Sequence, residues 1–214
     1  MFVWDLPLRV FHWSLVATVV TCIVSAEMGG NAMEWHAIFG FVAIGLLFFR
    51  FMWAFLGGTY ARFSSYLDSH QHIVAWLRGN PATRPGYTPL GTIALVCMFT
   101  VLWAQGVSGL FANDDIMLEG PLYHLVTQHT ADWLTGWHKR GLYIVGGLVF
   151  LHVSAIFYYR FIKKIDYIRP IITGYKELPE GTPAELEGRP GSLPLALVLA
   201  SVSAASIWYV VTQL

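Results

Sequence analysis

Five long apolar runs divide the chain and constrain its fold more than any other feature. They cover about residues 11–27, 36–56, 90–111, 141–159 and 193–213. Each approaches the roughly 20 apolar residues that a helix needs to cross a bilayer. The chain is 56% hydrophobic and 12% charged, whereas a soluble domain carries about 25% charged residues. Because backbone in lipid must satisfy its own hydrogen bonds, we expect an all-α integral membrane protein with five spans.

Charge is distributed unevenly between the connections. Segments 28–35 and 112–137 carry acidic residues and no Lys or Arg, whereas 57–89 and 160–192 carry several basic residues. Lys and Arg prefer the cytoplasmic side of a membrane. With five spans, we therefore expect a cytoplasmic N-terminus and a C-terminus on the outer side of the membrane. The net charge of zero gives no sign of a nucleic-acid partner, and we expect membrane lipid as the surroundings.

The spans suggest a division of the chain into three parts. Residues 1–164 would form a transmembrane core of four helices, and residues 193–214 an additional C-terminal transmembrane helix. Residues 165–192, rich in Pro, Gly and Glu, are expected to be a cytoplasmic linker between them. Residues 61–78 (ARFSSYLDSHQHIVAWLR) suggest a short amphipathic helix on the cytoplasmic surface.

Four histidines sort into two pairs by their depth in the membrane. His138 and His152 lie fourteen residues apart in WHKRGLYIVGGLVFLH, which is about 21 Å along one helix at 1.5 Å per residue. His12 begins the first span, near the inner face, and His36 begins the second, near the outer face. Depth therefore pairs His12 with His152 and His36 with His138. Ionisable side chains at membrane depth usually mark functional sites.

Paired histidines from neighbouring helices favour haem over a bare metal ion. Two imidazoles leave zinc or copper short of ligands, whereas a porphyrin supplies four nitrogens and needs only two axial ligands. The sequence has no C-x-x-C-H, so the haem would be non-covalent. Gly40 and Gly141, one turn from His36 and His138, could make room for a ring or allow close helix packing. We therefore predict two haem b groups, with metal ligands His12, His36, His138 and His152.

Basic side chains near the predicted sites are candidate partners of the haem propionates. Arg9 and Arg50 lie close to the inner pair in the sequence, and Lys139 and Arg140 follow His138 at the outer end of the fourth span. Charge-assisted hydrogen bonds to carboxylates would suit either set. Cytoplasmic anchoring is an equally good explanation of the two arginines.

Three stretches resemble the bacterial cytochrome b561 family: RVFHW at 9–13, EWHAIFGF at 34–41 and GWHKRGLYIVGGLVFLH at 136–152. The family includes the b-type haem subunits of nickel-iron hydrogenases and formate dehydrogenases, and the resemblance covers about residues 3–160. It implies a four-helix core that holds two b haems and exchanges electrons with quinone. The fifth span and the 165–192 linker depart from the simplest members.

These features predict a cytochrome that relays electrons across the membrane between the quinone pool and an extracytoplasmic redox protein, such as a c-type cytochrome or a dehydrogenase subunit. It would then be the electron-transfer subunit of a quinone-linked oxidoreductase. By the resemblance, quinone would react near the inner haem, where the sequence adds Arg9, Arg50 and the aromatic segment Phe49–Phe55. An outer pocket with His124, His129 and Trp133 is the alternative.

Two other functions are compatible with the same histidines. One is a stand-alone membrane oxidoreductase that acts on a small external acceptor such as ferric iron or superoxide. The acidic 112–137 segment would attract cations rather than superoxide. The other is a haem-free transporter that uses the histidines as a proton relay, and such a protein would be colourless.

Overall fold

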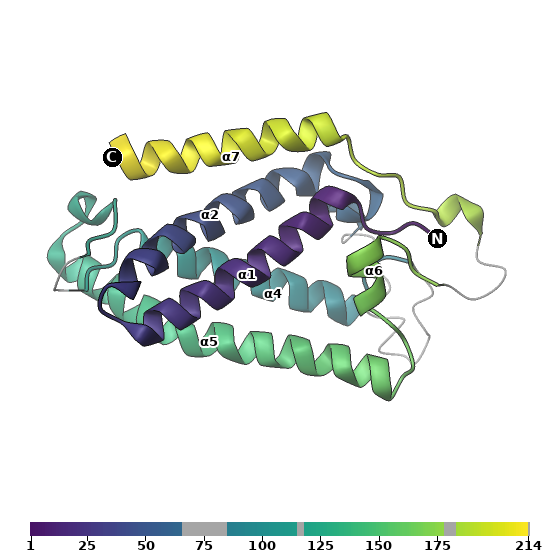
Figure 1. The fold of residues 1–214 in the computed structure, drawn as a ribbon, viewed down its shortest axis with the longest axis horizontal. Coiled ribbons are helices and arrows are strands. Elements are labelled where there is room, and N and C mark those ends of the chain that lie inside the picture. The colour runs from purple at the N-terminus through teal and green to yellow at the C-terminus, as the bar shows by residue number, and fades with distance from the viewer. Residues whose placement is uncertain (66–84, 115–117, 178–182, 214) are drawn as a thin grey trace. The chain divides into compact units, whose positions relative to one another are not determined.

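Five long helices make up most of the computed structural model, which describes residues 1–65, 85–114, 118–177 and 183–213 (Figure 1). The helices are α1 (Leu6–Met28), α2 (Ala32–Leu56), α4 (Pro89–Gly109), α5 (Gln128–Phe161) and α7 (Leu193–Gln213). All five are long and apolar enough to cross a membrane. The described residues contain no strand, only the isolated bridges Phe2–Tyr175 and Asn113–Glu119. The expected all-α, multi-pass membrane architecture is thereby confirmed.

Shorter helices occupy the connections. They are η1 (Thr59–Ala61), η2 (Tyr123–Leu125), α6 (Ile168–Thr173) and η3 (Ala184–Leu186). Two of them lie within the segment expected to be a plain linker, 165–192. Most of the amphipathic helix predicted over 61–78 falls outside the described residues.

The helix α5 is longer than its apolar run. It begins at Gln128, not near residue 141, and its 34 residues extend about 51 Å at 1.5 Å per residue. Thr127 provides the start, because its hydroxyl accepts a hydrogen bond from the Thr130 backbone N–H at 3.3 Å. Ala131 and Thr135, one turn apart, are both buried. The first part of α5 is therefore polar overall but buries one of its faces, so its hydropathy does not identify it as helix.

The chain forms two compact units, each assembled from three segments. The first unit comprises Met1–Phe11, Arg50–Cys97 and Val149–Leu197, and the second comprises His12–Phe49, Met98–Leu148 and Val198–Leu214.

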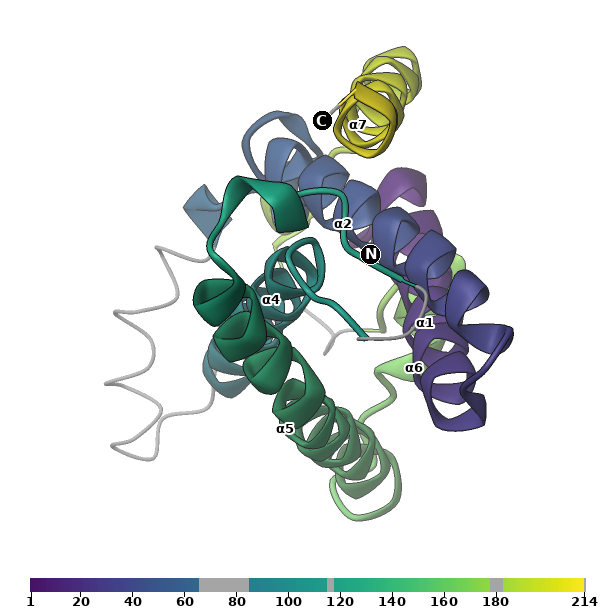
Figure 2. The same ribbon diagram turned by 90° about the vertical axis from the view of Figure 1, so that its left-hand side faces the viewer.

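Small residues bring the helices of the second unit together. A Cβ added to Gly106 of α4 would lie 2.8 Å from Ile44 Cγ1 of α2, closer than ordinary contact, whereas one added to Gly45 of α2 would lie 3.4 Å from Ile207 of α7, at ordinary contact distance. Glycine at a position such as 106 lets membrane helices approach closely. In this unit α4 lies between α2 and α5, and α7 lies on α2 (Figure 2).

The first unit is organised around the buried carboxylate of Asp5, which is 2% exposed. It accepts hydrogen bonds from the Leu8 and Gly58 backbone N–H groups at 3.0 Å, from the Trp53 indole at 3.2 Å and from the Gly191 N–H at 3.3 Å. The carboxylate thus ties the start of α1 to the end of α2 and to the segment before α7.

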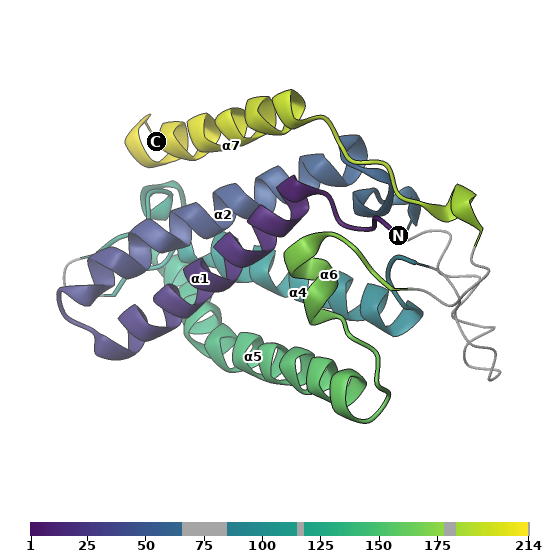
Figure 3. The same ribbon diagram turned by 45° about the vertical axis from the view of Figure 1, so that its right-hand side comes forward.

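The N-terminal segment also pairs with the chain that follows α6, as Figure 3 shows. The backbone N–H groups of Val3 and Trp4 donate to the Gly174 carbonyl at 2.8 and 3.1 Å. Gly174 has φ +90°, a left-handed conformation that glycine adopts without strain. The first half of segment 165–192 is therefore hydrogen-bonded to the N-terminal segment.

Candidate functional site

The second unit brings His36 of α2 and His138 of α5 together. Their ring centroids lie 5.8 Å apart, with the ring planes at 81°. Metal–imidazole bonds of about 2 Å on opposite sides of one ion would place two ring centroids about 6 Å apart. The two histidines that the sequence assigned to the outer membrane face are therefore close enough to share one metal centre.

Backbone carbonyls fix the orientation of both imidazoles. His36 Nδ1 lies 2.9 Å from the Cys22 carbonyl oxygen, and His138 Nδ1 lies 2.9 Å from that of Gln105. A carbonyl can only accept, so each Nδ1 is the donor, and in the neutral ring with this tautomer Nε2 holds the lone pair. Metal-binding histidines are commonly held this way by a second hydrogen bond. Both rings thus present Nε2 as a potential ligand.

Two residues of α4, Gln105 and Gly109, position His138, and neither was predicted from the sequence. The Gln105 side-chain amide donates to the His138 carbonyl at 2.9 Å. A Cβ on Gly109 would lie 2.8 Å from His138 Cε1, so only glycine leaves room for the ring. Gln105 could have been singled out in the sequence, because an amide inside an apolar span is costly unless it is hydrogen-bonded.

The glycines chosen from the sequence have different surroundings. A Cβ on Gly141 would collide with the Gln105 side chain, so Gly141 allows close packing of α4 on α5. A Cβ on Gly40 would meet no atom within 4 Å. The space beside Gly40 is therefore open, and its role beside a ring stays a prediction.

The chemistry of the donor set also fits a porphyrin. Among the described residues, no group of three or more His, Cys, Asp or Glu side chains could hold a metal ion. Two imidazoles would leave a bare zinc or copper ion without a full shell. They match the two axial positions of a haem iron.

The inner pair remains a prediction. His12 belongs to the second unit and His152 to the first. The His12 ring lies 5.3 Å from that of Trp13. His138 and His152 do lie in one continuous helix, α5, so the spacing of about 21 Å along its axis holds.

The basic residues near the predicted sites have protein partners or are exposed. Arg50 is buried, and its Nη1 donates to the Ala61 carbonyl at 3.2 Å. Arg9 Nη1 donates to the Ile172 carbonyl at 2.5 Å. Lys139 and Arg140 are exposed, and Arg140 lies over the Trp137 ring at 5.9 Å. The contact of these four residues with haem propionates remains a prediction.

The residues of the alternative outer quinone pocket do not form a buried site. His124 lies in η2 and His129 in the first turn of α5, and both are exposed. Trp133 is 59% exposed and packs edge-on against Trp137, with ring centroids 6.1 Å apart. Exposed tryptophans at a helix end are typical of a membrane interface.

Comparison with known proteins agrees with this chemistry. Residues 3–174 match the family model of prokaryotic cytochrome b561. The chain is 25% identical over 225 residues to a probable Ni/Fe-hydrogenase B-type cytochrome subunit of Azotobacter chroococcum mcd 1 and 26% identical over 223 residues to one of Azotobacter vinelandii. Each alignment covers 86% of this chain and 91% of the relative. No solved structure matches the chain.

The family match covers most of the chain and includes all four predicted histidine ligands. It extends beyond the resemblance seen in the sequence, through α6 to residue 174. A b-type cytochrome carries haem b and transfers electrons. The matches therefore indicate that this multi-pass helical protein transfers electrons in a membrane. The protein belongs to the prokaryotic cytochrome b561 family.

Proposed function

We propose that the protein relays electrons across the membrane between the quinone pool and an extracytoplasmic redox partner, through two haem b groups. The observation that carries the proposal is the pair His36 and His138, 5.8 Å apart with both Nδ1 atoms bonded to backbone carbonyls. A bis-histidine iron has no free position for oxygen and takes up or releases one electron. Electron transfer is thereby favoured over oxygen chemistry.

The protein's part is to hold and orient the cofactors. His36 and His138 would bind the outer haem, and His12 and His152 the inner one. Gln105 would position His138 by holding its backbone carbonyl. Arg9 and Arg50 are proposed for the inner propionates, and Lys139 and Arg140 for the outer ones.

Quinone is proposed to react near the inner haem. Exposed aromatic rings at the end of α2 support this side: Phe51 and Phe55 are 43% and 57% exposed, and Phe63 joins them with centroids 6.3 and 5.1 Å away. Such a cluster offers a lipid-soluble ring an apolar surface beside Arg50, a polar anchor. The proposed orientation, with the N-terminus in the cytoplasm and the C-terminus in the periplasm of a bacterial inner membrane, places the cluster on the cytoplasmic side.

The proposed partner is an extracytoplasmic redox protein. The names of the two Azotobacter relatives favour a hydrogenase, while a c-type cytochrome or another dehydrogenase subunit would use the same haem. The chain would then be the electron-transfer subunit of a quinone-linked oxidoreductase. A haem-free transporter is disfavoured by family membership, and no observation on the described residues supports a stand-alone reductase of ferric iron or superoxide.

The relay is tested in proteoliposomes that contain the purified protein. A quinol analogue in the bilayer should reduce the haems, and a membrane-impermeant oxidant outside should reoxidise them. His138→Ala should stop external reoxidation while quinol still reduces the inner haem. His129→Ala, an exposed control in the same helix, should behave as the wild type. Equal external reoxidation of the His138→Ala protein would contradict the relay.

The place of quinone reaction is tested by a second comparison. Arg50→Lys keeps the charge but changes the anchor beside the aromatic cluster, so it should slow quinol reduction with both haems retained. His124→Ala and His129→Ala should leave that rate unchanged. If these two variants lose quinol reactivity and Arg50→Lys does not, the quinone site lies at the outer face.

A further inference from the structure

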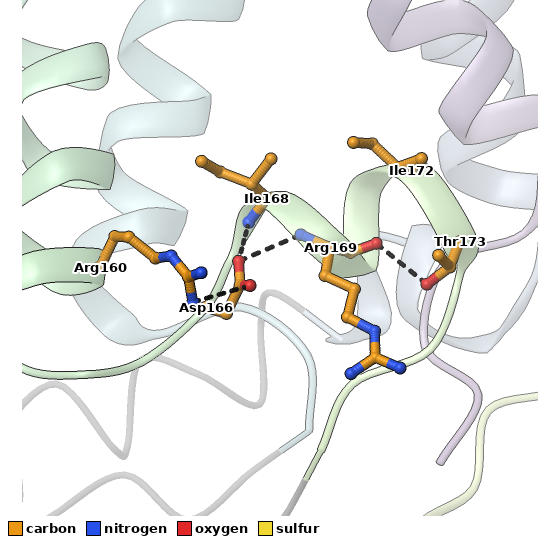
Figure 4. A pocket seen from close by; sticks show the side chains of 6 residues that line it. All are labelled: Arg160, Asp166, Ile168, Arg169, Ile172 and Thr173. Atoms are coloured by element: carbon orange, nitrogen blue, oxygen red, sulfur yellow. Dashed lines mark hydrogen bonds and ion pairs between the residues drawn. The ribbon is translucent and has the colours of Figure 1, made fainter.

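The first unit contains an open pocket of about 330 Å³ between the end of α5 and the short helix α6. Figure 4 shows the side chains around it. The lining residues are Arg160, Asp166, Ile168, Arg169, Ile172 and Thr173. This pocket contains none of the proposed haem ligands and has no part in the relay described above.

Two guanidinium groups and one carboxylate line the pocket. Arg160 and Arg169 face a single carboxylate, Asp166, which bonds Arg160 Nη1 at 3.0 Å. The backbone N–H of Arg169 and then that of Ile168 donate to Asp166, and these bonds keep its pKa below the usual value. Asp166 therefore stays ionised and pairs with Arg160, while Arg169 pairs with Glu177, which does not line the pocket.

Both arginines keep donors available for a ligand. Their side chains are 49% and 62% exposed, and each guanidinium has five N–H groups. Arg160 uses Nη1 on Asp166, and Arg169 uses Nη1 on Glu177, which is itself 86% exposed at the surface. Planar guanidinium groups with free N–H bonds are well suited to phosphate oxygens.

A third guanidinium adjoins the same pocket. Arg9 donates through Nη1 to the carbonyl of the lining residue Ile172 at 2.5 Å. Its Nε is buried and has no hydrogen-bond partner in the described structure. Arg9 therefore bonds the backbone of one lining residue but is not itself part of the pocket lining.

Apolar side chains border the charged end of the pocket. Ile168 and Ile172 line it and are 37% and 55% exposed. Phe161, Ile162 and Ile165, at and after the end of α5, are 60%, 66% and 40% exposed. A free anion would gain nothing from contact with these apolar side chains. A ligand with a phosphate group and acyl chains would contact both the arginines and the isoleucines.

We propose that this pocket binds the phosphate headgroup of an anionic glycerophospholipid. The position suits such a ligand, because the pocket follows directly on the apolar helix α5, where the chain leaves the membrane. Basic pockets beside transmembrane helices on the cytoplasmic side recognise anionic headgroups. The lipid would contact Arg160 and Arg169 through its phosphate and Ile168 and Ile172 through its acyl chains.

The test uses the full-length haem-loaded protein in detergent and native mass spectrometry. The probes are phosphatidylglycerol, phosphatidylcholine with the same acyl chains, and glycerol 3-phosphate. The wild type should retain one phosphatidylglycerol in preference to phosphatidylcholine, and glycerol 3-phosphate should not displace it at equal concentration. Displacement by glycerol 3-phosphate would mean that a free anion is the ligand. Equal retention of both lipids would mean that the pocket does not select the anionic headgroup. Either result would overturn the proposal.

Variants locate the bound lipid. Arg160→Gln with Arg169→Gln should weaken phosphatidylglycerol binding about twenty-five-fold, or about fivefold for each arginine. Lys163→Gln with Arg189→Gln removes the same charge from outside the pocket and should leave binding within about twofold. If loss of the Asp166 ion pair unfolds the double variant, Arg169→Gln alone should still show about a fivefold loss. Wild-type binding by the arginine variants, or an equal loss in the control, would refute the site.

Discussion

Replacing Gly109 with alanine tests whether His138 is a haem ligand, because the added methyl group acts on that ring directly. The new Cβ would lie 2.8 Å from His138 Cε1 and 3.1 Å from its Nδ1, whereas ordinary contact begins at 3.4 Å. The ring must therefore move by about 0.6 Å, from 3.4 minus 2.8. Metal–ligand distances tolerate changes of only about 0.2 Å. We expect the outer haem to be weakened or lost.

The size of the effect follows from the cost of overpacking. Inserting a methyl group into a packed site costs about 1–3 kcal/mol. If this cost falls on the haem-bound state, outer-haem affinity falls about 5- to 140-fold, at about 1.4 kcal/mol per tenfold. The inner haem should keep its spectrum. Haem content per chain and the low-spin electron paramagnetic resonance signals measure the two sites separately.

Gly106→Ala is the matched control. It lies one turn earlier in α4, and its added Cβ would also lie 2.8 Å from a neighbour, but that neighbour is Ile44 Cγ1. The substitution should lower the thermal unfolding midpoint and leave both haems bound. The reasoning is refuted if Gly109→Ala retains as much outer haem as Gly106→Ala.

Three further substitutions test the contacts around the two units. Gln105→Leu removes the donor to the His138 carbonyl, so it should lower stability by about 1 kcal/mol and shift the outer-haem midpoint potential in a redox titration. Asp5→Asn weakens the buried hydrogen-bond cluster and should cost about 2–3 kcal/mol in detergent unfolding, whereas the exposed Asp132→Asn should cost almost nothing. Burial lowers the pKa of Lys176 to about 8 from 10.5, so the unfolded state binds more protons between these values. Stability should therefore rise as pH increases from about 8 to 10.5, and Lys176→Met should flatten this rise in pH-dependent melting curves.

The membrane architecture could be predicted from the sequence because hydropathy and length act locally. Each of the five apolar runs coincides with a long helix in the structure. The close approach of His36 and His138 also followed from depth, since two ends at the same membrane face can meet.

Packing between helices could not be predicted in the same way. Gln105 and Gly109 act on His138 from a third helix, α4, and no spacing within one segment reveals which helix will be its neighbour. The early start of α5 was missed because Thr127 and the buried Ala131 and Thr135 define a helix without an apolar run. The pairing of His12 with His152, the quinone site and the propionate partners stay predictions.

Haem stoichiometry, measured in the wild type and in His36→Ala, tests the central claim most directly. Pyridine haemochrome analysis of the purified protein should give haem b at a ratio near two per chain. His36→Ala should reduce the ratio to about one and remove one low-spin bis-imidazole signal, because His138 would lose its opposite ligand. A wild-type ratio near one, or an unchanged ratio in His36→Ala, would contradict the account.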